Sequence, residues 1–243
     1  ADHTISLTYA GKEIIQNSFG FKNIDVDVIP CCADTDLFNY KNITSQQKSN
    51  TKNELKIESN DFVLSYLGSV GTWYMPDEMM KFFKFLSKIK PNSKFLIITR
   101  DDPKIIYNLV KKYNIDPIKI IIKAANREDV PLLLSISQAS IFFIKPVFSK
   151  KASSPTKLAE ILGMGIPIIC NSNVGDLDKF IAENNLGVLI NDFSHKSIEH
   201  ICTNLDSIIE IDKKHLRSVA IELFSLKNGS EKYYEIYQKL SYT

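Results

Sequence analysis

Residues 153–176 read SSPTKLAEILGMGIPIICNSNVGD, and this stretch alone predicts a helix followed by a buried strand. Pro155 is favoured in the first turn of a helix, where its missing N–H costs nothing, and Ser153 or Ser154 can cap that turn. The glycines of the GMG triplet mark the end of the helix, and the apolar run IPIIC at residues 166–170 is typical of a strand in a parallel sheet.

The first turn of this helix carries groups suited to binding an anion. The backbone N–H groups of Thr156 and Lys157 would point outward at the positive end of the helix dipole, beside the threonine hydroxyl and the lysine ammonium. Glu160 lies on the same helix face one turn later, where its carboxylate can accept hydrogen bonds from ribose hydroxyls. The pattern predicts a diphosphate cradle with a ribose contact; the alternative is an ordinary Ser-Pro helix whose lysine is only solvated.

Strand-like and helix-like segments alternate along most of the chain, as in a parallel sheet covered by helices on both faces. Apolar runs predict strands at residues 5–8, 26–29, 62–67, 95–99, 118–122, 139–144, 166–170 and 187–190. Helical periodicity predicts helices at residues 12–17, 77–89, 103–113, 127–137, 156–164 and 176–184, and then, without further strands, at 196–210, 214–224 and 230–240. We therefore predict an α/β fold with a doubly wound, parallel, Rossmann-like sheet and a C-terminal helical segment.

Two segments lie outside this alternation. Residues 39–60 are polar and lack a sustained apolar face, so we expect a linker or a mobile surface loop there. The last helix carries Tyr233, Tyr234 and Tyr237, more rings than a solvated helix needs. It packs either on its own domain or back onto another one.

The composition sets broad limits on function. With 243 residues, 44% hydrophobic and 24% charged, the chain can bury one ordinary core, and a net charge of +2 offers no broad basic field for nucleic acid. The four cysteines include an adjacent pair, Cys31 and Cys32, but no CxxC motif, which argues against a disulfide framework or a zinc site and favours a reducing cytoplasm. The longest apolar runs are about ten residues, short of the roughly 20 that span a bilayer.

Further candidates follow the predicted strands. Gly68 and Ser69 come directly after the strand at 62–67, where an open α/β sheet binds its ligands, although a glycine pair after a strand is often only a turn. Trp73 and Tyr74 follow in the same turn and can stack on a sugar or plug the top of the sheet.

The next two strands end in polar residues. Arg100 can add positive charge to the site or pair with the aspartates that follow it. Ala125 is small enough to let a ligand approach the backbone. Asn126 stands at a natural capping position for the helix at 127–137, and we favour this cap over a contact with the base of a bound nucleotide.

Several stretches, in this order along the chain, resemble the C-terminal, donor-binding half of GT-B glycosyltransferases, in particular the large retaining family 4. They are ADHTISLT at 1–8, VIPCCADTDLF at 28–38, LSYLGSVGTWY at 64–74, the opening stretch at 153–176, and YYEIYQKL at 233–240. The resemblance implies that residues 1–38 are a remnant of an acceptor-binding domain missing upstream, 39–60 the linker, 61–227 the nucleotide-sugar-binding domain, and 228–243 a helix that crosses back to the N-terminal domain.

The resemblance also implies roles for the candidates. The predicted donor-binding residues are Gly68, Ser69, Arg100, Ala125, Asn126, Ser154, Thr156, Lys157 and Glu160, with the diphosphate at Thr156 and Lys157 and the ribose at Glu160. No catalytic residue and no metal ligand is assigned.

Two departures from the family pattern concern the same site. Ala152 stands where family 4 enzymes commonly carry a first glutamate, eight positions before Glu160, and residues 68–80 lack the family's usual Arg and Lys. The donor sugar and the stereochemical outcome therefore stay open.

We predict a metal-independent, hexosyltransferase-like enzyme, retaining by resemblance, that moves a sugar from a UDP- or GDP-linked donor to an acceptor in cell-surface polysaccharide or glycan synthesis. No cofactor and no nucleic-acid partner are expected. The expected location is the cytoplasm, with an acceptor at the inner face of the membrane compatible with it. A sugar-nucleotide epimerase of the same fold and a non-catalytic Rossmann-like binding domain are the alternatives.

Overall fold

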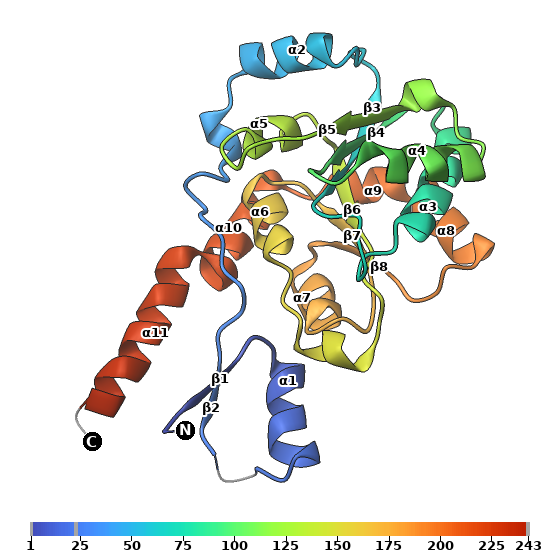
Figure 1. Cartoon of the computed structure of the whole chain (residues 1–243). Coiled ribbons are helices and arrows are strands. Elements are labelled where there is room, and N and C mark those ends of the chain that lie inside the picture. The colour runs from blue at the N-terminus through green and yellow to red at the C-terminus, as the bar shows by residue number, and fades with distance from the viewer. Residues whose placement is uncertain (1, 22–23, 242–243) are drawn as a thin grey trace.

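The structure is a computed structural model that describes residues 2–21 and 24–241. Its centre is a parallel sheet of six strands in the order β5-β4-β3-β6-β7-β8 (Figure 1). The strands are β3 (Phe62–Leu67), β4 (Ser93–Ile98), β5 (Ile120–Lys123), β6 (Ala139–Phe142), β7 (Ile168–Asn171) and β8 (Gly187–Ile190). The chain enters this sheet at β3, in the middle, and proceeds to the edge strand β5. It then returns to the middle at β6 and proceeds to the other edge strand, β8. The predicted doubly wound α/β fold is confirmed.

Helices cover both faces of this sheet. One layer has α3 packed against α4 and α8, and the other has α6 packed against α10 (Figure 1). The body's helices are α2 (Ser45–Glu54), α3 (Pro76–Ile89), α4 (Pro103–Lys112), α5 (Val130–Leu134), α6 (Thr156–Gly163), α7 (Leu177–Asn184), α8 (His195–Thr203), α9 (Leu205–Ile209) and α10 (Lys213–Phe224). Short 3-10 turns lie at Tyr40–Asn42, Pro117–Lys119 and Phe148–Ala152.

The central strands are buried along their whole length. Every residue of β3, β6 and β7 is buried, because helices cover them on both sides. The continuous apolar runs that predicted these strands are the direct result, since no residue of such a strand faces water.

The N-terminal segment forms a small unit at one end of the molecule. Strands β1 (Thr4–Ser6) and β2 (Val26–Val28) pair in parallel, and α1 (Tyr9–Glu13) continues into a π-helical turn, Ile14–Ser18. The Asp176 carboxylate caps α1 by accepting hydrogen bonds from the backbone N–H groups of Tyr9 and Ala10, at 2.7 and 3.0 Å. The unit is therefore held against the loop that precedes α7.

The last helix, α11 (Leu226–Ser241), points toward the end of the molecule that carries β1 and β2 (Figure 1). Its start packs on the segment that follows β2, because Ala33 exchanges backbone hydrogen bonds with Phe224 and Leu226. Tyr234 and Tyr237 are exposed.

Some expected boundaries are wrong. Residues 45–54, expected to be part of a loop, form α2, because Thr44 and Gln47 make a reciprocal capping box and Leu55 and Ile57 beyond it are buried. The helix expected at 127–137 is shorter than predicted and forms only α5, and the one expected at 196–210 is broken into α8 and α9.

Among residues 2–21 and 24–241, none of the helices combines the length and the apolar character that a membrane span requires.

Candidate donor-binding site

A cavity of 390 Å³ lies at the carboxyl ends of β3, β4 and β5, next to the first turn of α6. This is where the strand order reverses between β3 and β6, the place where open α/β sheets bind ligands. The residues that line it are Phe38, Leu67, Gly68, Tyr74, Arg100, Ala125, Arg127, Val130, Thr156, Lys157 and Glu160.

Lys157 lines this cavity without a polar partner among the residues that the structure describes. Its side chain is buried, and its Nζ makes no hydrogen bond within the described part of the chain. Instead, the ammonium lies 3.7 Å from the ring centre of Tyr74 and 4.6 Å from that of Tyr66. Burial lowers the pKa of Lys157 to about 7, and the nearby Glu160 charge opposes that shift. The Lys157 amine is therefore desolvated and without a polar partner, and a nearby anion would favour its charged form.

Gly68 makes room for this lysine. A Cβ at residue 68 would lie 2.5 Å from Lys157 Nζ, and the backbone φ of +123° is one that other residues rarely adopt. The end of β3 and the first turn of α6 can approach one another this closely because residue 68 has no side chain.

The start of α6 differs from the prediction in its cap. Pro155 is the N-cap residue rather than part of the first turn, and no side chain caps the helix. The Ser154 hydroxyl instead accepts a hydrogen bond from the backbone N–H of Cys31, at 3.0 Å. This holds the segment after β2 against the site. Thr156 is exposed at the helix start and lines the cavity.

Glu160 is buried and paired, but not with Lys157. Arg127 Nη1 donates a hydrogen bond to Glu160 Oε1 at 2.8 Å, and the Arg127 guanidinium lies 5.1 Å from the ring centre of Phe38. No other hydrogen bond to this carboxylate exists among residues 2–21 and 24–241, so Glu160 Oε2 remains open to a ligand.

Arg100 ties two loops of the site together. Its Nε donates to the Ala125 carbonyl at 2.9 Å, and its Nη2 donates to Asn126 Oδ1 at 3.0 Å. The predicted cap is therefore wrong: the Asn126 side chain binds Arg100, and α5 starts only at Val130. The alternative of an ion pair from Arg100 to the neighbouring aspartates is absent from the described residues as well.

Asp101 holds the turn after β3 in place. Asp101 accepts hydrogen bonds from the Ser69 hydroxyl, at 2.8 Å, and from the Val70 N–H, at 2.6 Å. Trp73 is half exposed, with the Lys150 ammonium 4.2 Å from its ring centre, while Tyr74 faces the cavity. Of the two adjacent aromatic residues, the tyrosine shapes the cavity and the tryptophan lies outside its lining.

The structure brings six of the nine predicted residues together around the cavity: Gly68, Arg100, Ala125, Thr156, Lys157 and Glu160. The other three, Ser69, Asn126 and Ser154, support neighbouring loops through the hydrogen bonds given above. Sequence reasoning missed Arg127, whose only local signal was its position after the strand at 118–122, and the Phe38 ring beneath it.

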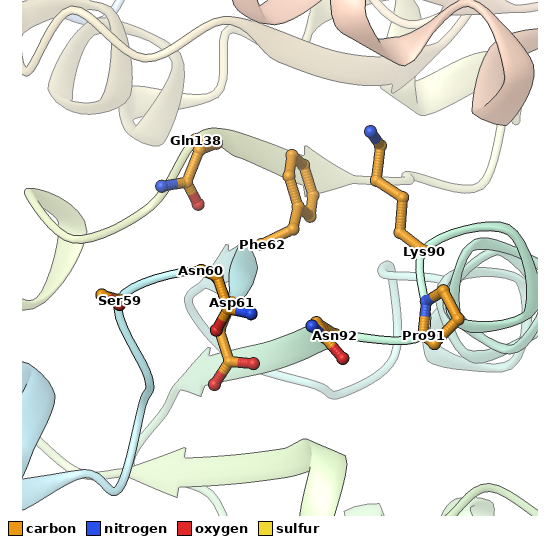
Figure 2. A pocket seen from close by; sticks show the side chains of 8 residues that line it. All are labelled: Ser59, Asn60, Asp61, Phe62, Lys90, Pro91, Asn92 and Gln138. Carbon is orange, nitrogen blue, oxygen red and sulfur yellow. The ribbon is translucent and has the colours of Figure 1, made fainter.

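A second depression lies at the opposite ends of the strands. Figure 2 shows its lining, which includes Asp61, Phe62, Lys90 and Gln138, around 540 Å³ of space. Its polar groups serve the fold: Gln138 Oε1 accepts from the Val63 N–H at 2.7 Å, and Lys90 pairs with Asp206. Because ligands of doubly wound sheets bind at the carboxyl ends, we place the functional site at Lys157 and not here.

Fold and site together define a doubly wound α/β protein with a cationic cavity at its topological switch point. The family model described as glycosyl transferases group 1 matches residues 47–218, and the chain belongs to this family. A comparison with curated proteins found no match.

Solved glycosyltransferases share this fold. The Rickettsia africae glycosyltransferase is 17% identical with a TM-score of 0.76, over 98% of this chain and 63% of that one. WaaG, described as involved in lipopolysaccharide biosynthesis, is 16% identical with a TM-score of 0.72, over 89% of this chain and 57% of that one. Anabaena HepE, solved with UDP-glucose, is 14% identical with a TM-score of 0.73, over 100% of this chain and 64% of that one. The chain thus spans about 57 to 64% of the length of these proteins.

Proposed function

We propose that this chain is the donor-binding part of a glycosyltransferase that transfers a sugar from a nucleoside diphosphate sugar to an acceptor. In this proposal Lys157 and the first turn of α6 hold the diphosphate, and Glu160 holds the ribose. Arg100 and Arg127 add positive charge at the rim. The acceptor belongs to cell-surface polysaccharide or glycan synthesis, and a separate acceptor-binding domain completes the enzyme.

The observation that carries the proposal is the unpaired Lys157 ammonium in the cavity at the switch point. A buried cation without an anionic partner is costly unless a ligand supplies the missing charge. The first turn of α6, which has no side-chain cap, offers backbone N–H groups and the positive end of its dipole at the same place. A diphosphate satisfies both groups at once.

The similar proteins support a uridine nucleotide as the first ligand to test. HepE was solved with UDP-glucose, and the pneumococcal O-GlcNAc transferase GtfA was solved with UDP and GlcNAc. Such enzymes stabilise the leaving diphosphate by fixed positive groups, and this chain offers Lys157 and Arg100 for that role. Hexosyl transfer without a metal, retention of configuration and a cytoplasmic location are further parts of the proposal.

An epimerase acting on the same donor needs acid and base groups around the sugar. The lining of the cavity contains one carboxylate, Glu160, and no histidine within the described residues. No observation therefore favours the epimerase over the transferase.

The test is calorimetric titration of this chain with UDP, GDP and ADP, repeated with Lys157→Met and Glu160→Gln. We expect saturable binding of one diphosphate, weakened by about 1 to 3 kcal/mol in each variant, as for a lost charge-assisted hydrogen bond. Exposed Lys104 on α4 provides the control, since Lys104→Met removes the same charge away from the cavity. Absence of binding for all three nucleotides at millimolar concentration would refute the donor site in this chain.

A further inference from the structure

We propose that Arg127 is a positioning residue that keeps Glu160 and Lys157 apart, so that helix α6 does not neutralise its own binding site. The identity of the ligand that Lys157 and Glu160 then bind, a nucleoside diphosphate sugar, rests on the proposed function. The separation itself is a property of the empty protein.

Lys157 and Glu160 are oppositely charged groups that would be expected to form an ion pair. Lys157 and Glu160 are three residues apart on one helix, both are buried, and both line one cavity. Such residues are neighbours on a helix surface, and burial increases their attraction because the local dielectric constant is low. No ion pair joins them in the described structure.

Arg127 provides the competing partner for Glu160. It reaches across the cavity from the loop before α5 and binds Glu160 Oε1 at 2.8 Å. Its guanidinium lies over Phe38, whose side chain is 1% exposed and whose carbonyl accepts a hydrogen bond from buried Arg217 at 2.9 Å. The Phe38 ring that supports Arg127 is therefore well fixed, and so is Glu160 Oε1, to which Arg127 donates its hydrogen bond.

Two tyrosine rings hold Lys157 on the other side. The ammonium lies against the faces of Tyr74 and Tyr66, contacts that stabilise a cation without neutralising it. The charged groups that face Lys157 in the cavity are Glu160, Arg100 and Arg127, and the titratable rings are the two tyrosines. Glu160 is the only anion among them, so its attachment to Arg127 decides whether Lys157 stays unpaired.

Removal of Arg127 should let the two groups of α6 pair with one another. Glu160 would then be oriented toward Lys157 rather than toward a ribose. The charge of Lys157 would already be neutralised by Glu160 when a diphosphate binds. One substitution would therefore weaken recognition of both parts of the nucleotide. A residue that only supports the loop would not alter the titration of Lys157.

The test compares wild type with Arg127→Gln and Arg127→Lys in two measurements. The first is the NMR titration of Lys157 in the absence of nucleotide, assigned with Lys157→Met. We expect its midpoint to rise in Arg127→Gln toward the ordinary lysine pKa, and to rise less in Arg127→Lys, which keeps a cation for Glu160. The second is calorimetric titration with UDP and 2′-deoxy-UDP. We expect wild type to prefer UDP by about tenfold and Arg127→Gln to lose that preference.

Arg127 is exposed, so its replacement should leave folding intact, and Lys104→Gln on α4 controls for the loss of one charge. An unchanged Lys157 midpoint together with an unchanged preference in Arg127→Gln would overturn the inference while leaving UDP binding in place. If wild type binds no UDP but the midpoint rises, the proposed function fails and the positioning role of Arg127 stands.

Discussion

Replacement of Lys157 by methionine should stabilise the empty protein while it weakens binding of the diphosphate. Burial lowers the lysine pKa from 10.5 to about 7, so the folded state disfavours the ammonium that the unfolded chain carries at neutral pH. At 1.36 kcal/mol per pKa unit, this penalty is about 4 kcal/mol at pH 7. We therefore expect Lys157→Met to raise the free energy of unfolding at pH 7 by up to about 4 kcal/mol.

The pH dependence of this gain identifies its cause. Between pH 7 and 10.5 the unfolded chain binds a proton at residue 157 that the folded chain lacks, so the lysine's contribution to stability rises with pH through this window. The advantage of Lys157→Met should shrink accordingly and vanish near pH 10.5. Glu160, Arg100 and Arg127 also line the cavity but are present in both proteins, so they largely cancel in the difference.

The assay is urea unfolding of wild type and Lys157→Met at a series of pH values from 7 to 10.5, with Lys104→Met as the exposed control. The control should show no comparable gain at any pH. A Lys157→Met protein that is less stable than wild type at pH 7, or a gain that is constant with pH, would refute the argument that desolvation of Lys157 destabilises the empty site.

Three further substitutions test the geometry. Gly68→Ala places a Cβ 2.5 Å from Lys157 Nζ at a φ of +123°, so we expect a loss of stability of about 1 to 3 kcal/mol in urea unfolding and weaker UDP binding by calorimetry. Asp176→Asn weakens the carboxylate cap of α1, and hydrogen exchange of the α1 amides should accelerate by about fivefold, for a cap worth roughly 1 kcal/mol, while the central strands stay protected. Gly187→Ala directs a Cβ to 1.9 Å from the Ile168 carbonyl oxygen inside the sheet, so the β7–β8 pair should not form as it stands and the thermal midpoint should fall.

The fold follows from sequence where burial is complete. The bounds of β3 are those predicted, because a strand covered on both faces leaves a mainly apolar run, here between Asp61 and Gly68. Helix α2 was missed because it has no apolar face and is stabilised locally by the capping box of Thr44 and Gln47. A search for periodicity does not detect such a helix, whereas a search for capping pairs does.

The site could be predicted only in its local part. Lys157 and Glu160 follow from their places on one helix, and Gly68 from its place after a strand. Arg127 could not be assigned in the same way, because its contact with Glu160 joins residues 33 positions apart through the tertiary fold. The Asn126 prediction failed for the same reason: a capping preference worth about 1 kcal/mol gave way to a hydrogen bond from Arg100, brought there by the order of β4 and β5.

The arrangement around Lys157 explains why the empty site is costly and why that cost suits its proposed role. An ammonium already paired with Glu160 would offer a diphosphate little net charge, and binding would first have to break the pair. An ammonium exposed to water would be screened and would have to be desolvated on binding. Here the rings of Tyr66 and Tyr74 have already taken Lys157 out of water, and Arg127 has already engaged Glu160. The folded chain thus bears the cost of desolvation before the ligand arrives, so the stability gained by Lys157→Met and the affinity lost by it should have one origin.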